Sequence, residues 1–381
     1  MSAPLCVVVG AGRLATGYVA PLLADAGWQV ALTSRTAGVL AALRGPGGLV
    51  VHSGRDLPRP VDGVVGVHCD NPSLPALVRR ADLVVTSVGP GALPEIGARL
   101  GPMLLARLAA RRAPLNVLTF ENHRRAPELL AGGLMATAPE LAAEIGRRLG
   151  LAGAAAWQVA VSRDTVGGTL VVHTDGVTES YVDAVALRPG VPPLDGSLPG
   201  PVPVAPFDEW ITAKLWAFNG GHAAAAYLGR LAGHETVAAA LADPPLRAQV
   251  RAVVVEALAA LPPSQYRDPE TLLDRYAEPL LADPVTRVAR EPRRKLGPGD
   301  RLIGPAVAGL AAGVRPVALA RVAAAALAYH DPDDPQSVTL SCEVALLGPA
   351  EVLAAVSVLD PGDELSRLIC AAHDELAAVA R

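Results

Sequence analysis

The sequence predicts an α/β domain of the Rossmann type, with a doubly wound sheet, followed by an all-α domain. Three observations carry this prediction. Short apolar runs alternate with helix-period segments over residues 1–175, a glycine-rich turn follows the first of these runs, and the pattern from Phe207 onward is almost wholly helical and alanine-rich. Strands that alternate with helices imply parallel pairing with right-handed crossovers.

The elements of the first half follow from these periodicities. The predicted strands are Leu5–Val9, Gln29–Thr33, Val64–His68, Leu83–Val88, Asn116–Phe120, Gln158–Val161 and Thr169–His173. The helix-period segments between them include Ala15–Ala26, Leu93–Arg111 and Ala138–Leu149. The stretch Arg188–Pro206 is dense in proline and glycine, so it can sustain neither a helix nor a central strand. We therefore predict a dinucleotide-binding domain over residues 1–190, a connection over 191–205 and a helical substrate-binding and catalytic domain over 206–381.

Composition limits the classes of function. The chain has 381 residues, of which 51% are hydrophobic and 18% charged, and this suits a globular enzyme with two cores. A net charge of −4 gives no global basic field, so we expect neither nucleic acid nor a membrane surface as a partner. No apolar run is long enough to span a membrane, and no basic segment precedes the first strand as in a signal peptide. We expect a cytoplasmic protein that is a monomer or a homodimer.

The cysteines argue against a metal centre and against a disulfide framework. They are far apart and form no CxxC pair: Cys6, Cys69, Cys342 and Cys370. We therefore predict chemistry that needs no metal.

A glycine-rich turn indicates a dinucleotide. The segment VVVGAGRLATG fits GxGxxA directly after a strand and opens a helix. Gly10 permits the tight turn, Gly12 lets the backbone approach the pyrophosphate, and Ala15 allows close packing of helix and strand. Arg13 and Leu14, at the start of the helix, complete the predicted contact. A tight turn without a ligand is the plainer alternative.

The end of the second strand indicates which cofactor is used. An NAD site usually has Asp or Glu there, whereas this chain has Ser34-Arg35, whose hydroxyl and guanidinium suit a 2′-phosphate. We therefore favour NADP(H), with NAD(H) possible, over a solvated loop arginine. Val88 and Gly89, after the fourth strand, are predicted to contact the cofactor because loops at the carboxyl ends of the strands line the ligand crevice. An ordinary turn would explain them equally well.

The strongest chemical signal is the segment KLWAFNGGHAAAAYLG, at the start of the helical domain. At 100° per residue, Lys214, Asn219 and His222 share one arc of about 140° on an otherwise apolar helix. Oxidising a secondary alcohol without zinc needs a base and donors to the developing alkoxide. Lys214 can be the base, with Asn219 and His222 orienting the substrate oxygens. A lysine that extends to water and a histidine satisfied in the core are the alternative.

Two further sets of residues are candidates. Asn122 follows a buried strand, so it can share oxyanion stabilisation, although such residues are more often helix caps. The segment from Arg287 to Arg301 is strongly basic, and guanidinium groups bind phosphate bidentately. Arg290, Arg294 and Lys295 are the predicted phosphate ligands, while a solvated, ion-paired loop explains most of the segment.

These motifs resemble the mannitol-1-phosphate 5-dehydrogenase family of polyol-specific long-chain dehydrogenases over nearly the full length of the chain. The resemblance rests on GAGRLATGY, ADLVVTSVGP, ENH, KLWAFNGGHAAAAYLGRLAGHETV, RYAEPLLADPVTRVAREPRRKLGPGDRLIGP and DDPQ. It implies that Lys214 is the general base, that Asn122 and Asn219 stabilise the oxyanion, and that His222 helps to position the substrate. It also implies a small sugar or sugar-phosphate substrate and a metal-independent, NAD(P)-dependent interconversion of a (phospho)polyol and a keto-sugar (phosphate).

Three departures from the family pattern leave alternatives open. Ser34-Arg35 replaces the family's Asp, Ser162–Val166 replaces Asp-Arg-Ile-Val-Pro, and Arg124–Pro127 replaces the residues after the ENH asparagine. The substrate can therefore be another phospho-sugar, a non-phosphorylated keto-sugar, a hexuronate or a specialised-metabolism intermediate. A β-hydroxyacid or opine-type dehydrogenase and a non-catalytic NADPH-binding protein are more distant alternatives.

Overall fold

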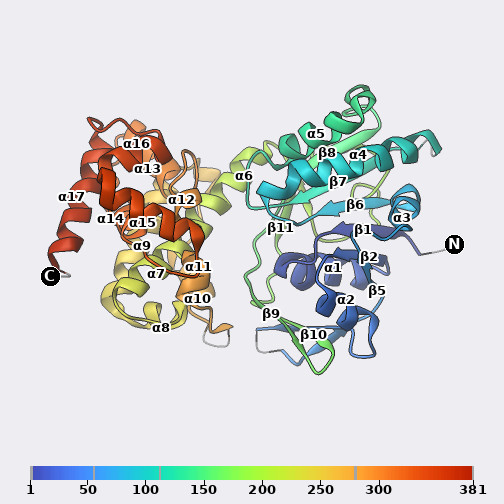
Figure 1. Ribbon diagram of the computed structural model, residues 1–381, viewed down its shortest axis with the longest axis horizontal. Coiled ribbons are helices and arrows are strands. Elements are labelled where there is room, and N and C mark those ends of the chain that lie inside the picture. Colours follow the sequence, from blue (N-terminus) through green and yellow to red (C-terminus); the bar gives the residue numbers. More distant parts are fainter. Residues whose placement is uncertain (1–2, 55, 111–112, 279–280, 380–381) are drawn as a thin grey trace. The chain divides into compact units, whose positions relative to one another are not determined.

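The computed structural model describes residues 3–54, 56–110, 113–278 and 281–379. The chain divides into two compact units, Met1–Ile211 and Thr212–Arg381. Within the described ranges, the strands all belong to the first unit, and the second is built from helices (Figure 1). This confirms the predicted fold class.

The first unit is built on an eight-stranded sheet. Its six parallel strands have the order β5-β2-β1-β6-β7-β8; β11 then pairs antiparallel with β8, and β12 forms the edge. The order reverses between β1 and β6, as in a dinucleotide-binding fold, where ligands bind at the carboxyl ends of the strands beside this reversal. The strands are β1 (Leu5–Val9), β2 (Gln29–Ser34), β5 (Val64–His68), β6 (Leu83–Thr86), β7 (Leu115–Phe120), β8 (Leu149–Ala156), β11 (Ser180–Asp183) and β12 (Val202–Val204).

Helices cover both faces of this sheet. Cys6 and Val8 of β1 pack into one apolar core with Tyr18 and Leu23, whereas Val7 packs into a second core on the opposite face. Because both faces are covered, β1 is a continuous apolar run rather than an alternating one. The helices of this unit are η1 (Ala15–Val19), α1 (Ala20–Asp25), α2 (Ala37–Arg44), α3 (Leu74–Arg80), η2 (Pro90–Ala92), α4 (Leu93–Ala110), α5 (Ala126–Thr137) and η3 (Pro139–Ala143).

A second, four-stranded sheet was not expected from the sequence. Its order is β4-β3-β10-β9, with β10 parallel to β3 and antiparallel to β9. The strands are β3 (Leu49–Ser53), β4 (Arg59–Val61), β9 (Ala160–Val166) and β10 (Thr169–Thr174). The strand predicted at Gln158–Val161 is observed as β9, which begins at Ala160 and continues to Val166 because it forms a hairpin with β10.

The predicted helix Ala138–Leu149 is wrong. Only the short η3 forms, and Gly146, at a φ of +81°, then turns the chain into β8. The β8 sequence LGLAGAAA has few strong strand formers, but it is buried throughout, so tertiary packing decides its structure. Arg111, the predicted end of another helix, lies outside the described residues.

The proline- and glycine-rich segment for which we predict an interdomain connection belongs to the first unit. The buried Asn116 holds its start: its amide donates to the carbonyl oxygens of Arg188 and Pro192 at 3.1 and 2.8 Å. The segment ends in the edge strand β12, which pairs with β11. An edge is where a strand tolerates proline, because one side of the strand needs no hydrogen-bonding partner.

The second unit is arranged around α7, which packs against α8, α9, α11 and α14. Gly221 and Gly229 allow this close packing, since a Cβ at either would lie 2.6 to 2.7 Å from Val254 or Ala240. Its helices are α6 (Phe207–Ala213, which begins in the first unit), η4 (Lys214–Phe218), α7 (Asn219–Leu231), α8 (Val237–Ala242), α9 (Pro244–Ala259), η5 (Pro263–Gln265), α10 (Pro269–Tyr276), α11 (Val285–Ala289), α12 (Pro292–Lys295), α13 (Ile303–Ala311), α14 (Val317–Leu327), α15 (Pro335–Leu347), α16 (Pro349–Ser357) and α17 (Glu364–Val379).

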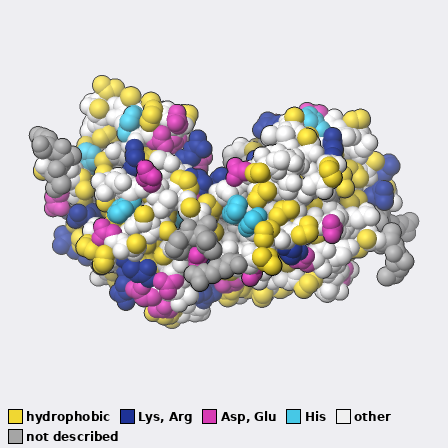
Figure 2. Space-filling view, turned by 90° about the horizontal axis from the view of Figure 1, so that it is seen from below, with side chains coloured by type: hydrophobic (Ala, Val, Ile, Leu, Met, Phe, Trp, Pro, Cys, Tyr) yellow, Lys and Arg dark blue, Asp and Glu magenta, His cyan; other side chains and the backbone are white. Residues whose placement is uncertain are grey.

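The surface carries charges of both signs. On the face shown in Figure 2, basic and acidic side chains are interspersed rather than gathered into a basic stripe. None of the helices in the described part of the chain is both long enough and apolar enough to cross a bilayer.

Candidate active site

The glycine-rich turn has the geometry that a dinucleotide needs. Gly10 has a φ of +103°, and a Cβ there would lie 2.4 Å from the Ser87 carbonyl oxygen. A Cβ at Gly12 would approach Ser87 only to 3.7 Å, so the turn is open at that point. The helix that follows begins at Arg13 and continues through Leu14 into η1. These features fit a pyrophosphate bound at the start of the helix.

A buried carboxylate, which the sequence argument did not single out, shapes the neighbouring loop. Glu121, after β7, accepts hydrogen bonds from the backbone N–H groups of Val88 and Gly89 at 2.7 and 3.0 Å. Gly89 has a φ of +89°, which favours glycine. Glu121 thus fixes the two residues for which we predict cofactor contact. The signal available in the sequence was an acid directly after a predicted buried strand. Asn122, the next residue, is exposed and belongs to the same unit.

The end of β2 presents a hydroxyl and a guanidinium. Ser34 Oγ accepts a hydrogen bond from the Thr36 N–H at 3.0 Å, and Arg35 is exposed. The Ser34 carbonyl accepts from the Cys69 N–H at 3.2 Å, which ties this end to the loop after β5. The acid nearest along that loop is Asp70, which is paired with Arg99 at 2.5 Å.

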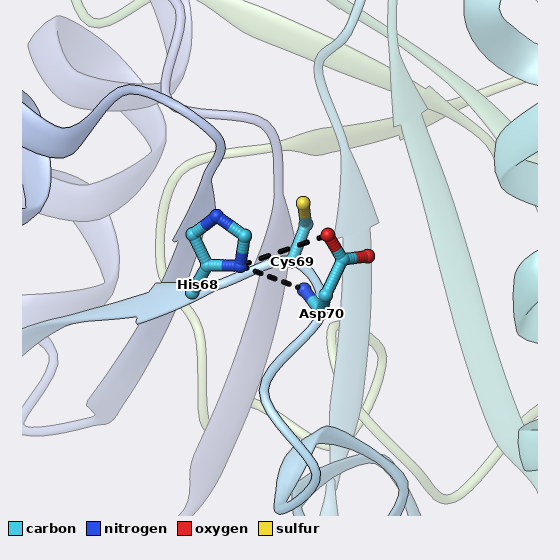
Figure 3. A group of neighbouring side chains, drawn as sticks. All are labelled: His68, Cys69 and Asp70. Carbon is cyan, nitrogen blue, oxygen red and sulfur yellow. Dashed lines mark hydrogen bonds and ion pairs between the residues drawn. The ribbon is translucent and has the colours of Figure 1, made fainter.

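One group of possible metal ligands lies among the described residues, namely His68, Cys69 and Asp70 (Figure 3). His68 Nδ1 already accepts a hydrogen bond from the Asp70 N–H at 3.1 Å. The hydrogen bond from Arg99 lowers the pKa of Asp70, so this carboxylate already has a cationic partner. The group is therefore explained as a hydrogen-bonded loop, and metal-independent chemistry stays a prediction.

A π-helical turn positions the predicted base. Lys214 opens η4, and the Asn219 N–H donates to the Lys214 carbonyl five residues back, rather than four as in an α-helix. The wider turn reduces the angular separation between Lys214 and Asn219 from the value that uniform α-helical spacing gives. Lys214, Asn219 and His222 lie on η4 and the first turn of α7. Such π-turns are frequent at functional sites.

Lysine usage is the clearest signal that the sequence argument missed. The chain has only two lysines, Lys214 and Lys295, and its other basic side chains, apart from histidine, are arginines. Both lysines are buried, with 4% of each exposed. Arginine stays charged in proteins, whereas a buried lysine can lose its proton. Lys214 and Lys295 are therefore buried ammonium groups of a kind that can lose a proton, which a guanidinium cannot.

His222 is held by partners from two other segments. Its ring stacks on Tyr276 with centroids 4.8 Å apart and planes 2° from parallel. Its Nε2 lies 3.1 Å from Oδ2 of the buried Asp283. Arg287 donates to both oxygens of Asp283.

Burial and charge set the protonation of this pair. Burial lowers the pKa of His222, and Asp283 only partly offsets this. Burial alone would raise the pKa of Asp283, but His222 and Arg287 bring it below its usual value. At neutral pH the arrangement is therefore a neutral imidazole beside a charged carboxylate.

Among the described residues, several buried polar side-chain atoms of this unit have no hydrogen-bonding partner. Two of them are nitrogen donors near the predicted site, Asn219 Nδ2 and Arg301 Nη2. Buried donors are rarely left unpaired, because each costs about 1–3 kcal/mol. Asn219 is a residue for which we predict substrate contact, and a substrate hydroxyl is the kind of acceptor that its amide nitrogen lacks.

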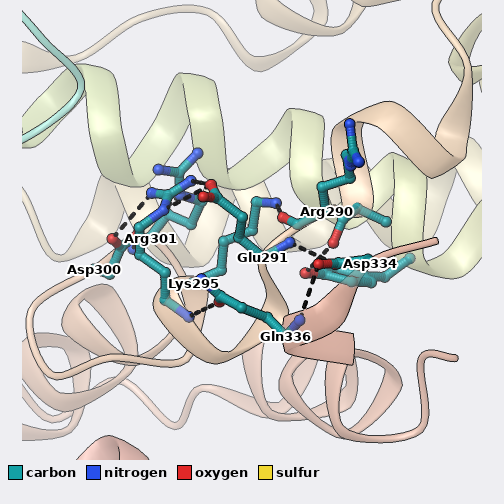
Figure 4. A network of polar contacts seen from close by, with 10 residues as sticks. Arg290, Glu291, Lys295, Asp300, Arg301, Asp334 and Gln336 are labelled. Carbon is teal, nitrogen blue, oxygen red and sulfur yellow. Dashed lines mark hydrogen bonds and ion pairs between the residues drawn. The ribbon is translucent and has the colours of Figure 1, made fainter. Parts of the chain in front are cut away.

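The basic segment forms a dense polar network (Figure 4). Lys295 Nζ donates to the Arg290 carbonyl and lies 5.8 Å from the centroid of the Tyr227 ring. Arg294 pairs with Glu291 at 2.8 Å, and the exposed Arg290 donates to a backbone carbonyl. Of the three predicted phosphate ligands, only Lys295 is both buried and, within the described ranges, without a carboxylate in contact.

The burial of Lys295 makes a prediction about stability. Burial, followed by the charges of Arg301 and Arg294, lowers the pKa of Lys295 well below its ordinary 10.5. Charging it therefore costs folding free energy, and this cost is largest at low pH and disappears as pH rises towards 10.5. We expect Lys295→Met to raise the free energy of unfolding by about 1–2 kcal/mol at pH 7. The advantage should shrink at pH 9.5 in denaturant titrations; a destabilised variant would contradict this.

Two known domain families match the chain, one in each half. Residues 5–150 match the mannitol dehydrogenase Rossmann domain, and residues 206–356 match the mannitol dehydrogenase C-terminal domain. Together these two matches span well over half of the chain.

Solved structures share the fold. Mannitol 2-dehydrogenase of Pseudomonas fluorescens, in a ternary complex with NAD and D-mannitol, superposes with a TM-score of 0.82 at 16% identity, covering 99% of this chain and 92% of that one. A D-sorbitol dehydrogenase gives 0.74 at 14% identity, covering 98% and 93%. A 2-dehydropantoate 2-reductase from Geobacter metallireducens gives 0.52 at 19% identity, covering 84% and 98%. The matches to both domains and the shared architecture show that this chain belongs to the mannitol dehydrogenase family, a family of nicotinamide-dependent polyol dehydrogenases.

Proposed function

We propose that the chain interconverts a small polyol, or a polyol phosphate, with the corresponding keto-sugar, using a nicotinamide dinucleotide and no metal. The observation that carries this proposal is the buried lysine beside an unpaired amide donor: Lys214 precedes Asn219 by one π-turn, and Asn219 Nδ2 has no partner among the described residues. A base and an oxyanion donor are what oxidation of a secondary alcohol requires.

Each residue then has a role in the reaction. A nicotinamide ring, when bound, exchanges the hydride with the carbinol carbon. Lys214 takes the hydroxyl proton during oxidation and returns it during reduction. Asn219 donates to the oxygen as negative charge develops, and Asn122 keeps its predicted role as a further oxyanion donor. The neutral His222, fixed by Asp283 and Tyr276, orients a second substrate hydroxyl.

Two substrate classes are candidates, one phosphorylated and one not. A phosphorylated substrate would use Lys295, with Arg290 and Arg294, as its phosphate ligands. However, Arg294 is paired with Glu291, and Arg301 binds Asp300 at 2.8 Å. Because these arginines already have carboxylate partners, a non-phosphorylated polyol, keto-sugar or hexuronate is the second candidate.

A substrate panel tests the function. Mannitol, sorbitol, their phosphates, and the corresponding keto-sugars and hexuronates are assayed by NAD(P)H absorbance, with and without a chelator. We expect turnover of at least one polyol and keto-sugar pair at a rate that the chelator leaves unchanged. Cofactor binding without turnover of any of these would favour a non-catalytic NADPH-binding protein, and a chelator-sensitive rate would overturn metal independence.

The loop after β2 makes a prediction about the cofactor. Arg35 is exposed at the position where NAD-specific folds usually have an acid, so we propose that NADPH binds more tightly than NADH. A charge-assisted contact to the 2′-phosphate is expected to contribute about ten- to hundredfold in affinity. Fluorescence titration of both cofactors measures this ratio. Arg35→Ala should abolish it, Arg79→Ala should leave it unchanged, and NADH binding as tight as NADPH binding would refute the proposal.

A further inference from the structure

The four-stranded sheet places a basic side chain on the glycine-rich turn. Strand β10 packs against η1, the helix that follows the turn: a Cβ at Gly17 would lie 2.8 Å from Thr174 Cγ2 and 3.0 Å from Val172 Cγ1. Arg163 of β9 is the register partner of Val172. The sheet is therefore seated where β9 reaches the turn, and Arg163 Nη1 donates a hydrogen bond to the Ala11 carbonyl, between the two glycines.

The charge of Arg163 is not neutralised by a contacting acid. Some arginines of the first unit have a carboxylate partner, as Arg59 has Asp25 at 2.6 Å and Arg99 has Asp70 at 2.5 Å. Within the described ranges, Arg163 makes no ion pair. The neighbouring Asp164 is exposed, and strand alternation directs it to the opposite face.

This half-buried guanidinium is also partly desolvated. Burial lowers the pKa of Arg163, with Asp164 only partly opposing this effect, although the group remains charged at any physiological pH. A charge that is desolvated and unpaired costs free energy, and a bound anion would offset that cost. The residue that Arg163 contacts lies in the turn whose backbone is shaped for a pyrophosphate.

We propose that Arg163 is a pyrophosphate-binding residue: one nitrogen holds the Ala11 carbonyl, and the remaining N–H groups donate to the phosphate oxygens of the dinucleotide. The proposal rests on the cofactor binding proposed above. It also gives a role to the four-stranded sheet that packs against η1. Two strands of this sheet, β3 and β4, precede β5 in the sequence, and the other two, β9 and β10, follow β8. Since both nicotinamide cofactors contain the pyrophosphate, this contact is independent of the 2′-phosphate and of Arg35.

Calorimetric titration of the full-length protein with ADP, adenosine, NADH and NADPH tests the assignment. In Arg163→Gln, a side-chain amide can still donate to Ala11 but the charge is lost. We expect ADP and both dinucleotides to bind about tenfold more weakly, with adenosine affinity unchanged. Arg163→Lys should restore most of the ADP affinity. Arg59→Gln, on β4 of the same sheet, is the matched control and should leave all four affinities unchanged.

The outcomes separate binding from structure. Equal losses for ADP and adenosine in Arg163→Gln, together with a lowered Tm, would mean that Arg163 only supports the fold, and this would overturn the proposal. Unchanged ADP affinity in a folded variant would overturn it as well. If the unmodified protein bound none of the four ligands, the proposed function would fail together with this assignment.

Discussion

Replacing Lys214 by alanine is expected to lower kcat by about 10²–10⁴-fold while leaving the fold and the cofactor affinity intact. The reason is that the proposed general base would move a proton in the transition state, whereas dinucleotide binding is assigned to the glycine-rich turn of the other unit. Because the base must be unprotonated, oxidation should slow as pH falls, whereas reduction, which needs the ammonium form, should slow as pH rises. Steady-state rates over pH in both directions measure this.

Two further variants sharpen the test. Lys214→Arg keeps a positive charge that cannot be lost, so it should be about as inactive as Lys214→Ala if proton transfer is the role. Lys295→Ala removes the other buried lysine and should act mainly on KM. A folded Lys214→Ala enzyme with near-normal kcat would refute the assignment of the base.

The composition of this chain allows the same groups to be observed directly. Because it has two lysines, isotope labelling of lysine gives two side-chain signals in a magnetic resonance spectrum. We expect the Lys295 signal to titrate well below the ordinary value of 10.5, since burial and neighbouring arginines lower its pKa. Only the Lys214 signal should be lost in Lys214→Arg, which assigns the two.

The parts of the fold that the sequence predicts are those set by local patterns. β1 and β5 have the bounds expected from their apolar runs, and GxGxxA identifies the turn between β1 and η1. β8 was not predicted because its alanines and glycines have little preference for a strand. Its extended conformation comes from pairing with neighbouring strands and from packing against Phe207. The small sheet was missed because it pairs β3 with β10, which are more than a hundred residues apart.

The candidate site also has some residues that local spacing predicts and others that only tertiary packing brings in. Lys214, Asn219 and His222 lie within nine residues of one another, so helical spacing suffices to group them. Asp283, sixty-one residues beyond His222, becomes its partner only through the packing of α11 on α7. Glu121 and Arg163 likewise act on backbone groups far away in the sequence. Periodicity therefore indicates which residues are candidates for the chemistry, and tertiary structure supplies the residues that hold them.

Replacing Asn219 by alanine is expected to cost about 10²–10³ in kcat, the loss typical of one oxyanion donor. Its amide nitrogen is buried and has no partner in the described part of the chain, so it is preorganised for an acceptor that gains charge during the reaction. Asn219→Asp keeps the shape but replaces the donor by a charge that repels the oxyanion, and it should lose more activity than the alanine variant.

If Asn122 shares this role, the Asn122→Ala and Asn219→Ala losses should be non-additive in the double variant. Folded Asn219 variants in which KM rises but kcat is unchanged would show instead that the amide binds substrate and transition state equally.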